Sequence, residues 1–197
     1  MKPTYALISS LSLVAIASAP ARAGGLGIVA TGGMHTDRAY YYNAEGQQGI
    51  DNQTQPQAGI GIEGLLGDRD DKILGIMRVY WLRDSPPNTP DTQGVEDPTY
   101  PDYESLDPRD VGVAEIGIQW GLLGAPAGLQ LTLTTLVGTG FITSDSTEFF
   151  LGDVGIGGTY GVAEAIQLYA NVGMNIRHRK IVSYGPAAYA GVRYLFD

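Results

Sequence analysis

Residues 129–141, LQLTLTTLVGTGF, alternate between two kinds of side chain. Odd positions hold Leu, Thr, Val and Phe, whereas even positions hold Gln, Thr and Gly, with Leu136 as the exception. A period of two is typical of a strand with two unlike faces. Residues 166–177 and 112–122 repeat the pattern. Segments of this length are long enough for a tilted strand to cross a bilayer.

Weaker alternation elsewhere brings the number of predicted strands to eight. We expect them at 25–35, 56–66, 72–83, 110–123, 128–142, 149–161, 166–178 and 186–196. Their connections alternate between tight turns (67–71, 124–127, 162–165) and longer loops (36–55, 84–109, 143–148, 179–185). This arrangement predicts an all-β, eight-stranded antiparallel up-and-down transmembrane β-barrel, with both termini periplasmic.

The alternative is a soluble eight-stranded barrel or sandwich, which also alternates. A soluble barrel fills its interior with large apolar side chains and carries Lys, Glu and Ser outside. Here the polar face is rich in Gly, Thr, Gln and Asn, and the apolar face carries almost no charge over whole strands. Such a face would be a very large exposed patch in water, so the pattern favours lipid.

Composition agrees with an exported membrane barrel. Glycine accounts for 28 of 197 residues, only 17% of residues are charged, and the net charge is −9. The acidic balance argues against nucleic-acid binding, which needs a basic surface. The absence of Cys excludes a disulfide scaffold, a thiolate metal site and a Cys nucleophile. We expect no cofactor and no metal.

The N-terminal segment predicts the route of export. Lys2 precedes an apolar stretch, Tyr5 to Ala17, and Ala21-Arg22-Ala23 forms a small-residue cleavage site. We interpret residues 1–23 as a signal peptide and residues 24–197 as an outer-membrane β-barrel domain. The stretch is too short and too rich in Ser for a membrane anchor.

The last strand carries a family resemblance. Residues 185–197 read GPAAYAGVRYLFD, with Ala188, Ala190, Val192, Tyr194 and Phe196 on one face. This resembles the C-terminal signature of bacterial outer-membrane barrels, although there the aromatic is the final residue, whereas here Asp197 follows it. The chain resembles the small OmpA/OmpX/OmpW-type class. The resemblance implies insertion by the barrel assembly machinery and contact with outer-membrane lipid and lipopolysaccharide.

Six charged residues are predicted to face the lumen. A barrel of this size is just wide enough for side chains to fill it, and buried charges must be paired. By depth we expect Arg78 to pair with Glu115, and Asp153 with Arg177. Glu63 would reach Lys72 or Arg193. The set forms either a lumen charge network that plugs the barrel or the ion pairs of a gated narrow pore: Glu63, Arg78, Glu115, Asp153, Arg177 and Arg193.

The connection at 84–109 is an acidic, proline-rich loop. Residues 84–108 hold seven acidic residues, no basic ones and six of the eleven prolines, so the segment cannot bury a core. It could dock a partner, act as an acidic cap or bind Ca²⁺, but its acidic spacing matches no EF-hand. The candidate docking or cation residues are Asp97, Asp102, Glu104 and Asp107. The run Tyr40–Tyr42 is predicted to join an interfacial aromatic girdle, the alternative being a binding surface.

An enzyme is the third reading, because some eight-stranded barrels modify lipid A. His178 could be drawn with Ser183 and Glu148 as a nucleophilic triad. The lipid A deacylase family, however, places its His and Ser two apart on one strand, and His178-Arg179-Lys180 lacks that pattern. We therefore expect no catalytic residues. Arg177, Arg179 and Lys180 are instead candidate contacts to lipopolysaccharide phosphates.

The sequence thus predicts an outer-membrane barrel with a structural or partner-binding role through its extracellular loops. Its partner would be an envelope or extracellular protein. A narrow pore or transporter for small solutes is the alternative, and a lipid A-modifying enzyme comes third.

Overall fold

The computed structural model describes residues 24–42, 48–68, 70–84, 109–142, 147–178 and 182–196, and within these ranges it forms eight β-strands. The strands match the predicted ones in number and order, and most extend beyond the predicted ends. Their bounds are β1 Gly24–Tyr42, β2 Gln48–Leu66, β3 Ile73–Asp84, β4 Arg109–Gly124, β5 Leu129–Ile142, β6 Thr147–Ala163, β7 Ile166–His178 and β8 Val182–Phe196.

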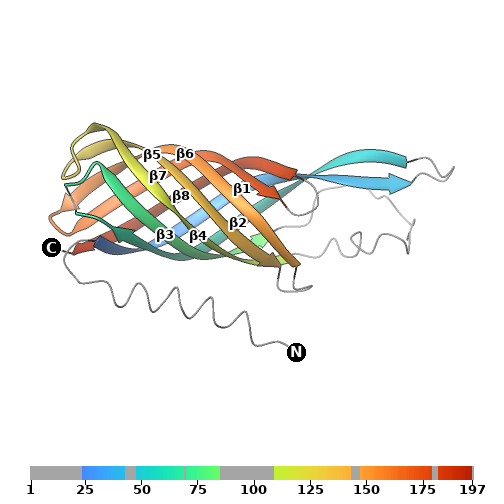
Figure 1. The fold of residues 1–197 in the computed structure, drawn as a ribbon, viewed down its shortest axis with the longest axis horizontal. Helices are drawn as coiled ribbons and strands as arrows, with labels where there is room; N and C mark the ends of the chain where they lie inside the picture. Colours follow the sequence, from blue (N-terminus) through green and yellow to red (C-terminus); the bar gives the residue numbers. More distant parts are fainter. Residues whose placement is uncertain are drawn as a thin grey trace, which may run out of the picture.

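Each strand pairs antiparallel with its neighbours in sequence, and β1 pairs with β8 to close the ring (Figure 1). The closing register runs from Gly24↔Phe196 to Thr36↔Tyr184. A closed ring leaves no strand edge within the barrel wall, so every backbone donor and acceptor there can be satisfied without water.

Three short turns lie at the end of the barrel where Gly24 and Phe196 meet, which we call the turn end. They join β2 to β3, β4 to β5 and β6 to β7, and the opposite end is the loop end. Gly67 (φ 125°) and Gly124 (φ 92°) begin the first two turns in backbone conformations that favour glycine. The strand bounds leave one long connection, 85–108, whereas the connection 43–47 is no longer than the turn 67–72. The predicted alternation of short and long connections is therefore wrong, because the strands extend into most of the predicted loops.

β1 and β2 continue past the barrel wall as a two-stranded ribbon at the loop end (Figure 1). They stay paired to Tyr42↔Gln48, whereas β1 leaves β8 at Thr36 and β2 leaves β3 at Gln57. The predicted loop at 36–55 is therefore wrong over most of its length. Pairing of the two chain segments extends the hairpin although their sequence does not alternate. Tyr40–Tyr42 belong to this ribbon, beyond the wall.

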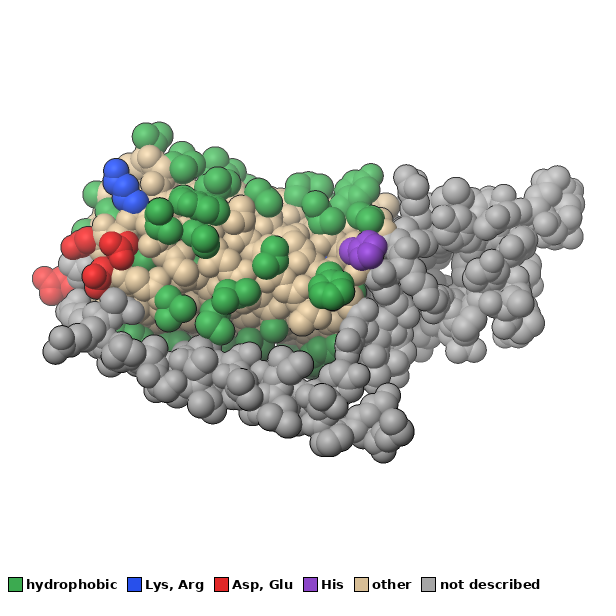
Figure 2. All heavy atoms as spheres, viewed as in Figure 1, with side chains coloured by type: hydrophobic (Ala, Val, Ile, Leu, Met, Phe, Trp, Pro, Cys, Tyr) green, Lys and Arg blue, Asp and Glu red, His purple; other side chains and the backbone are tan. Residues whose placement is uncertain are grey.

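The outer surface of the barrel is apolar (Figure 2). Along β7 the exposed and buried side chains alternate almost without exception. Exposed charged side chains in the described part of the chain are found at the turns, and at the loop end as Arg83 and His178. The most exposed large apolar side chains along the wall include Ile28, Ile60, Val137, Val172 and Leu129.

Both apolar and polar side chains fill the lumen. Toward the loop end a cluster of buried residues includes Val29, Tyr80, Val111 and Phe149, and a smaller cluster holds Leu65, Ile76, Leu136 and Leu195. Leu136, the exception in the quoted alternation, is 2% exposed and lies inside. Among the described residues, no helix is long and apolar enough to cross a membrane.

Candidate functional site

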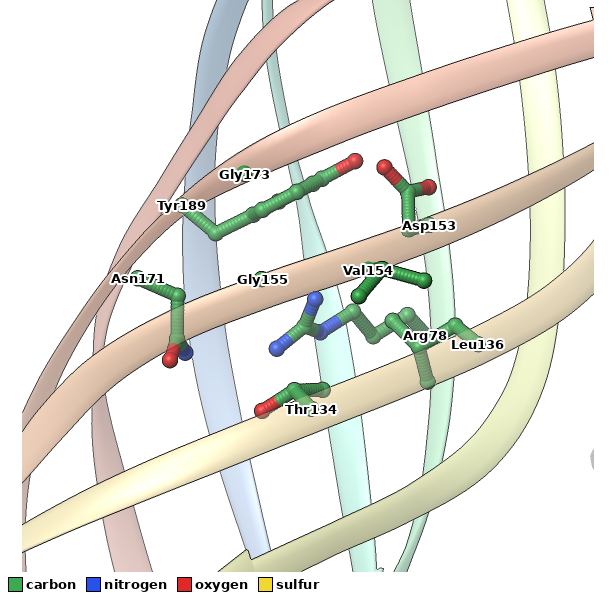
Figure 3. A pocket seen from close by; sticks show the side chains of 9 residues that line it. All are labelled: Arg78, Thr134, Leu136, Asp153, Val154, Gly155, Asn171, Gly173 and Tyr189. Carbon is green, nitrogen blue, oxygen red and sulfur yellow. The ribbon is translucent and has the colours of Figure 1, made fainter.

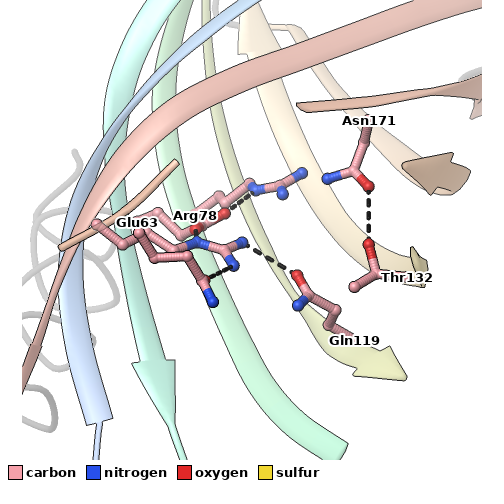
Figure 4. A network of polar contacts seen from close by, with 7 residues as sticks. Glu63, Arg78, Gln119, Thr132 and Asn171 are labelled. Carbon is pink, nitrogen blue, oxygen red and sulfur yellow. Dashed lines mark hydrogen bonds and ion pairs between the residues drawn. The ribbon is translucent and has the colours of Figure 1, made fainter. Parts of the chain in front are cut away.

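Glu63, Arg78 and Arg193 meet inside the barrel, where each is at most 1% exposed. Glu63 accepts a hydrogen bond from Arg78 Nε through Oε2 and one from Arg193 Nε through Oε1, each 2.5 Å long (Figure 4). One carboxylate thus lies between two guanidinium groups. Charge-assisted hydrogen bonds of this kind are the strong ones in proteins.

The strand register explains why these three side chains meet. Glu63 on β2 lies directly opposite Arg78 on β3. Arg193 belongs to β8, and β1 separates it from β2, but the residue of β1 in register with both Glu63 and Arg193 is Gly27. Since Gly27 has no side chain, the two charges reach each other across β1. A Cβ placed there would lie 3.1 Å from Arg193 Cγ and 2.7 Å from Val192 O.

Glutamines and aromatic rings complete the surroundings of the arginines. Arg193 donates from Nη1 to Gln167 Oε1 and from Nη2 to Gln119 Oε1, each at 3.1 Å. Its Cζ lies 3.9 Å from the centre of the Tyr169 ring, and Arg78 Cζ lies 4.7 Å from that of Tyr189. Cation–π contacts and the charge-assisted hydrogen bonds to Glu63 offset part of the cost of burying these guanidinium groups.

A second polar cluster lies around Asp153. Asn175 donates from Nδ2 to Asp153 Oδ2 at 3.0 Å and accepts from Arg177 Nε at 3.1 Å. Arg177 also donates to Gln57 of β2 and lies over the Phe149 ring, with 5.3 Å between Cζ and the ring centre. Asn175 therefore lies between the two residues that we predicted as a pair.

The expected pair of Arg78 with Glu115 is wrong. The two residues are in register on β3 and β4, as their depth predicted, but Arg78 binds Glu63 on its other side. Glu115 is 4% exposed, and neither of its carboxylate oxygens has a hydrogen-bond partner among the described residues. For Glu63 we predicted either Lys72 or Arg193 as the partner, and the structure shows Arg193.

All six residues predicted to face the lumen are buried there, three acidic and three basic. The charges balance, and together with the glutamines, tyrosines and apolar clusters they occupy the interior of the barrel. No group of three or more potential metal ligands occurs among the described residues. The arrangement is suited to hold the strands together and to block the lumen.

The residues predicted to contact lipopolysaccharide or a docking partner are only partly covered by the structure. Arg177 points into the lumen with 7% of its surface exposed, so its predicted contact with lipopolysaccharide is wrong. Arg179 and Lys180 lie outside the described residues, as do Asp97, Asp102, Glu104 and Asp107 of the acidic loop.

The hypothetical catalytic triad of His178, Ser183 and Glu148 does not form. His178 pairs with Val182, one position before Ser183. Because neighbouring residues of a strand point to opposite faces, His178 is exposed outside, whereas Ser183 is buried inside with 6% exposure. The side chain of Glu148 lies outside the described residues. A nucleophile and base that face opposite sides of the wall cannot exchange a proton.

Aromatic pairs lie at the two ends of the wall, at residues other than Tyr40–Tyr42, for which a girdle was predicted. Trp81 and Phe141 pack edge to face near the loop end, with their ring centres 6.3 Å apart. Tyr194 and Phe196 do so at the turn end, with centres 5.6 Å apart. Rows at both rims are typical of the aromatic girdles of membrane barrels. Single aromatics at strand ends were the available signal, and they become rows only when the strands are placed side by side.

The apolar band has the dimensions of a membrane. From Leu129 to Phe141 the chain rises about 40 Å along the strand. At the tilt of about 40° usual for such barrels this corresponds to a height of about 30 Å, the thickness of the hydrocarbon core. An apolar band of this height around a filled lumen is the geometry of a small eight-stranded transmembrane β-barrel.

Three solved structures are reported as similar to this chain. Neisserial surface protein A is 13% identical, with 87% of this chain and 96% of that chain covered and a TM-score of 0.41. Ail, the attachment invasion locus protein of Yersinia pestis, is 11% identical, with 89% of this chain and 99% of that chain covered and a TM-score of 0.45. The N-terminal β-barrel domain of Pseudomonas aeruginosa OprF is 12% identical, with 86% of this chain and 97% of that chain covered and a TM-score of 0.41. No family model matches the chain, and no curated protein does.

Proposed function

We propose that this barrel anchors the chain in the outer membrane and presents its loop end to a protein partner of the envelope or the cell exterior. The observation that carries this proposal is the filled lumen. Glu63, Arg78 and Arg193 hold one another inside the wall, and the second cluster continues the polar filling. A barrel blocked in this way offers its ends, rather than its interior, for function.

The loop end offers the larger surface. The β1–β2 ribbon extends beyond the wall there, and its outer edges pair with no other described strand. β3 ends and β4 begins at the same end, so the acidic segment 85–108 connects two strands there. Unpaired strand edges and charged loops are both common means of protein recognition.

The proposed topology places the turn end in the periplasm and the ribbon outside the cell. It includes removal of residues 1–23 as a signal peptide, insertion by the barrel assembly machinery, and contact with lipopolysaccharide. Short periplasmic turns and long external loops are the usual arrangement in this class.

A pull-down with three variants tests the partner. The refolded protein, a variant lacking residues 85–108 and a variant with 38–52 replaced by a two-residue turn are immobilised and exposed to detergent-solubilised envelope proteins. A third variant, altered only in the turn 125–128 at the opposite end, is the matched control. We expect one envelope protein to be recovered in a smaller amount with a loop-end variant than with the wild type. The control variant should recover the same amount of it as the wild type. Equal recovery of every protein from all four would reject the proposal.

A narrow pore is the second candidate, because Arg78 has a second carboxylate, Glu115, in register on its other side. Exchange of Arg78 between the two would rearrange the plug. Recording from planar bilayers with the wild type and Arg78→Ala decides between the candidates. Silence from both proteins rejects the pore, whereas discrete steps altered by the substitution would reject the plug.

A further inference from the structure

A small cavity lies between the two polar clusters of the lumen. Its volume is about 10 Å³, measured as the space open to the centre of a water molecule. Arg78 of the first cluster and Asp153 of the second both line it, together with Thr134 and Asn171. Figure 3 shows the Arg78 guanidinium with the Thr134 hydroxyl and the Asn171 amide to one side, and the Asp153 carboxylate to the other.

Each of these four side chains has a polar atom without a hydrogen-bond partner. The atoms are Arg78 Nη2, Thr134 Oγ1, Asp153 Oδ1 and Asn171 Nδ2, and the residues are 1%, 4%, 5% and 3% exposed. A buried polar atom without a partner loses its contact with solvent and gains no hydrogen bond in return, which is unfavourable. Four such atoms on side chains that line one cavity therefore indicate a ligand that satisfies them together.

The chemistry of the four atoms selects the ligand. Arg78 and Asn171 donate, Asp153 accepts, and the Thr134 hydroxyl can do either. Water accepts two hydrogen bonds and donates two, which matches this set. An anion would be repelled by Asp153, and a cation by Arg78. The volume is about that of a single-water site. We propose that the cavity binds one ordered water molecule, held by Arg78, Thr134, Asp153 and Asn171.

This water would join the two polar clusters into one hydrogen-bonded network. On one side Arg78 leads through Glu63 and Arg193 to Gln119. On the other side Asp153 leads through Asn175 and Arg177 to Gln57. The network would connect strands β2 to β8, with Thr134 as its member on β5. It would not conduct protons, because the guanidinium of Arg78 does not give up its proton in proteins.

Nuclear magnetic resonance of the refolded, isotope-labelled protein in detergent micelles detects such a water directly. We expect a cross-peak between water and the side-chain amide protons of Asn171, with the sign of a long-lived, slowly tumbling water. Absence of this cross-peak in the wild type overturns the proposal.

A cavity-filling variant and a matched control locate the water. Gly155 lines the cavity, and a Cβ there would meet its nearest atom, Val172 O, at 3.2 Å, so an alanine needs only a small adjustment. Gly155→Ala should reduce the cross-peak to background. Gly152 lies on the outer face of the same strand, and a Cβ there would lie 3.7 Å from its nearest atom, Leu136 O. Gly152→Ala should therefore leave the cross-peak unchanged. A cross-peak of wild-type intensity in Gly155→Ala would place the water elsewhere and overturn the assignment.

A second pair of variants keeps the test decisive if Gly155→Ala does not fold. Thr134→Val keeps the shape of the side chain but removes one of the four partners, so the cross-peak at Asn171 should weaken. Thr159 is equally buried and its hydroxyl also has no partner, but it does not line the cavity. Thr159→Val should therefore leave the cross-peak unchanged, and equal effects of the two substitutions would overturn the proposal.

Discussion

The carboxylate of Glu63 accepts one hydrogen bond from Arg78 and one from Arg193, whereas the carboxylate of Glu115, also in register with Arg78, accepts none from the described residues. Two glutamates of the same lumen, equally buried, thus have opposite roles. One carboxylate binds two guanidinium groups, and the other has no hydrogen-bond partner among the described residues.

Their replacement by glutamine should therefore have opposite consequences. Glu63→Gln leaves two buried guanidinium groups without their anion, and we expect the free energy of unfolding to fall by about 3–5 kcal/mol. Glu115→Gln replaces a buried carboxyl group that has no hydrogen-bond partner among the described residues, so stability should be unchanged or higher. Urea titration in micelles, followed by tryptophan fluorescence, measures both. Equal losses would contradict the assignment of Glu63 as the central anion.

The Glu63–Arg193 contact depends on the missing side chain of Gly27. Gly27→Ala places a Cβ against Val192 O and Arg193 Cγ, and overpacking of this kind costs about 1–3 kcal/mol. Gly32 lies on the same strand, and a Cβ there would meet nothing closer than 3.7 Å. Gly32→Ala should leave the urea midpoint of the wild type unchanged. A midpoint shifted equally by both variants would show that the register around Gly27 is not special.

A charged side chain introduced on the lipid-facing wall should lower the stability of the barrel more, the closer it lies to the middle of the membrane. Val137 and Leu129 lie on β5 and are 64% and 71% exposed, but Val137 is nearer the middle of the apolar band. Val137→Arg should lower the free energy of unfolding in lipid vesicles by about 2–4 kcal/mol, and Leu129→Arg by at most about 1 kcal/mol. On unboiled gels both variants should still migrate faster than after boiling. Equal penalties at the two depths would argue against a membrane-spanning wall.

The two tryptophans mark the two rims. Trp81 lies three residues from the loop end of β3, and Trp120 lies near the turn end of β4. In vesicles, lipids brominated near the headgroup should quench both more strongly than lipids brominated at the chain ends, because the rims lie at the interfaces. The single-tryptophan variants Trp81→Phe and Trp120→Phe separate the signals. Stronger quenching by the deep bromines would contradict the placement of the rims.

The barrel and the lumen residues follow from the sequence because both depend on alternation. A period of two assigns Arg78 or Asp153 to a face without any knowledge of neighbouring strands. Partner choice depends on more. Arg78 has a glutamate in register on each side, and alternation does not distinguish them. Glu63 is the one bound because Arg193 also converges on it past Gly27, a relation between three strands and not within one.

The ribbon was missed for a different reason. Alternation appears where one face of a strand meets lipid and the other face meets the lumen. Residues 37–42 and 48–55 of the ribbon lie beyond the wall and meet neither. Their pairing comes from the backbone of the extended hairpin, which leaves no periodic pattern of side chains. A hairpin in water is therefore harder to recognise in sequence than a strand in a wall.

The pairing of Gly24 with Phe196 brings the first and last residues of the wall together. Ring closure thus joins segments at opposite ends of the sequence, and it requires that the final strand has been synthesised. The wall has no privileged starting point: a circularly permuted chain, opened within the turn 125–128 and joined between residues 196 and 24, should form the same eight-membered ring.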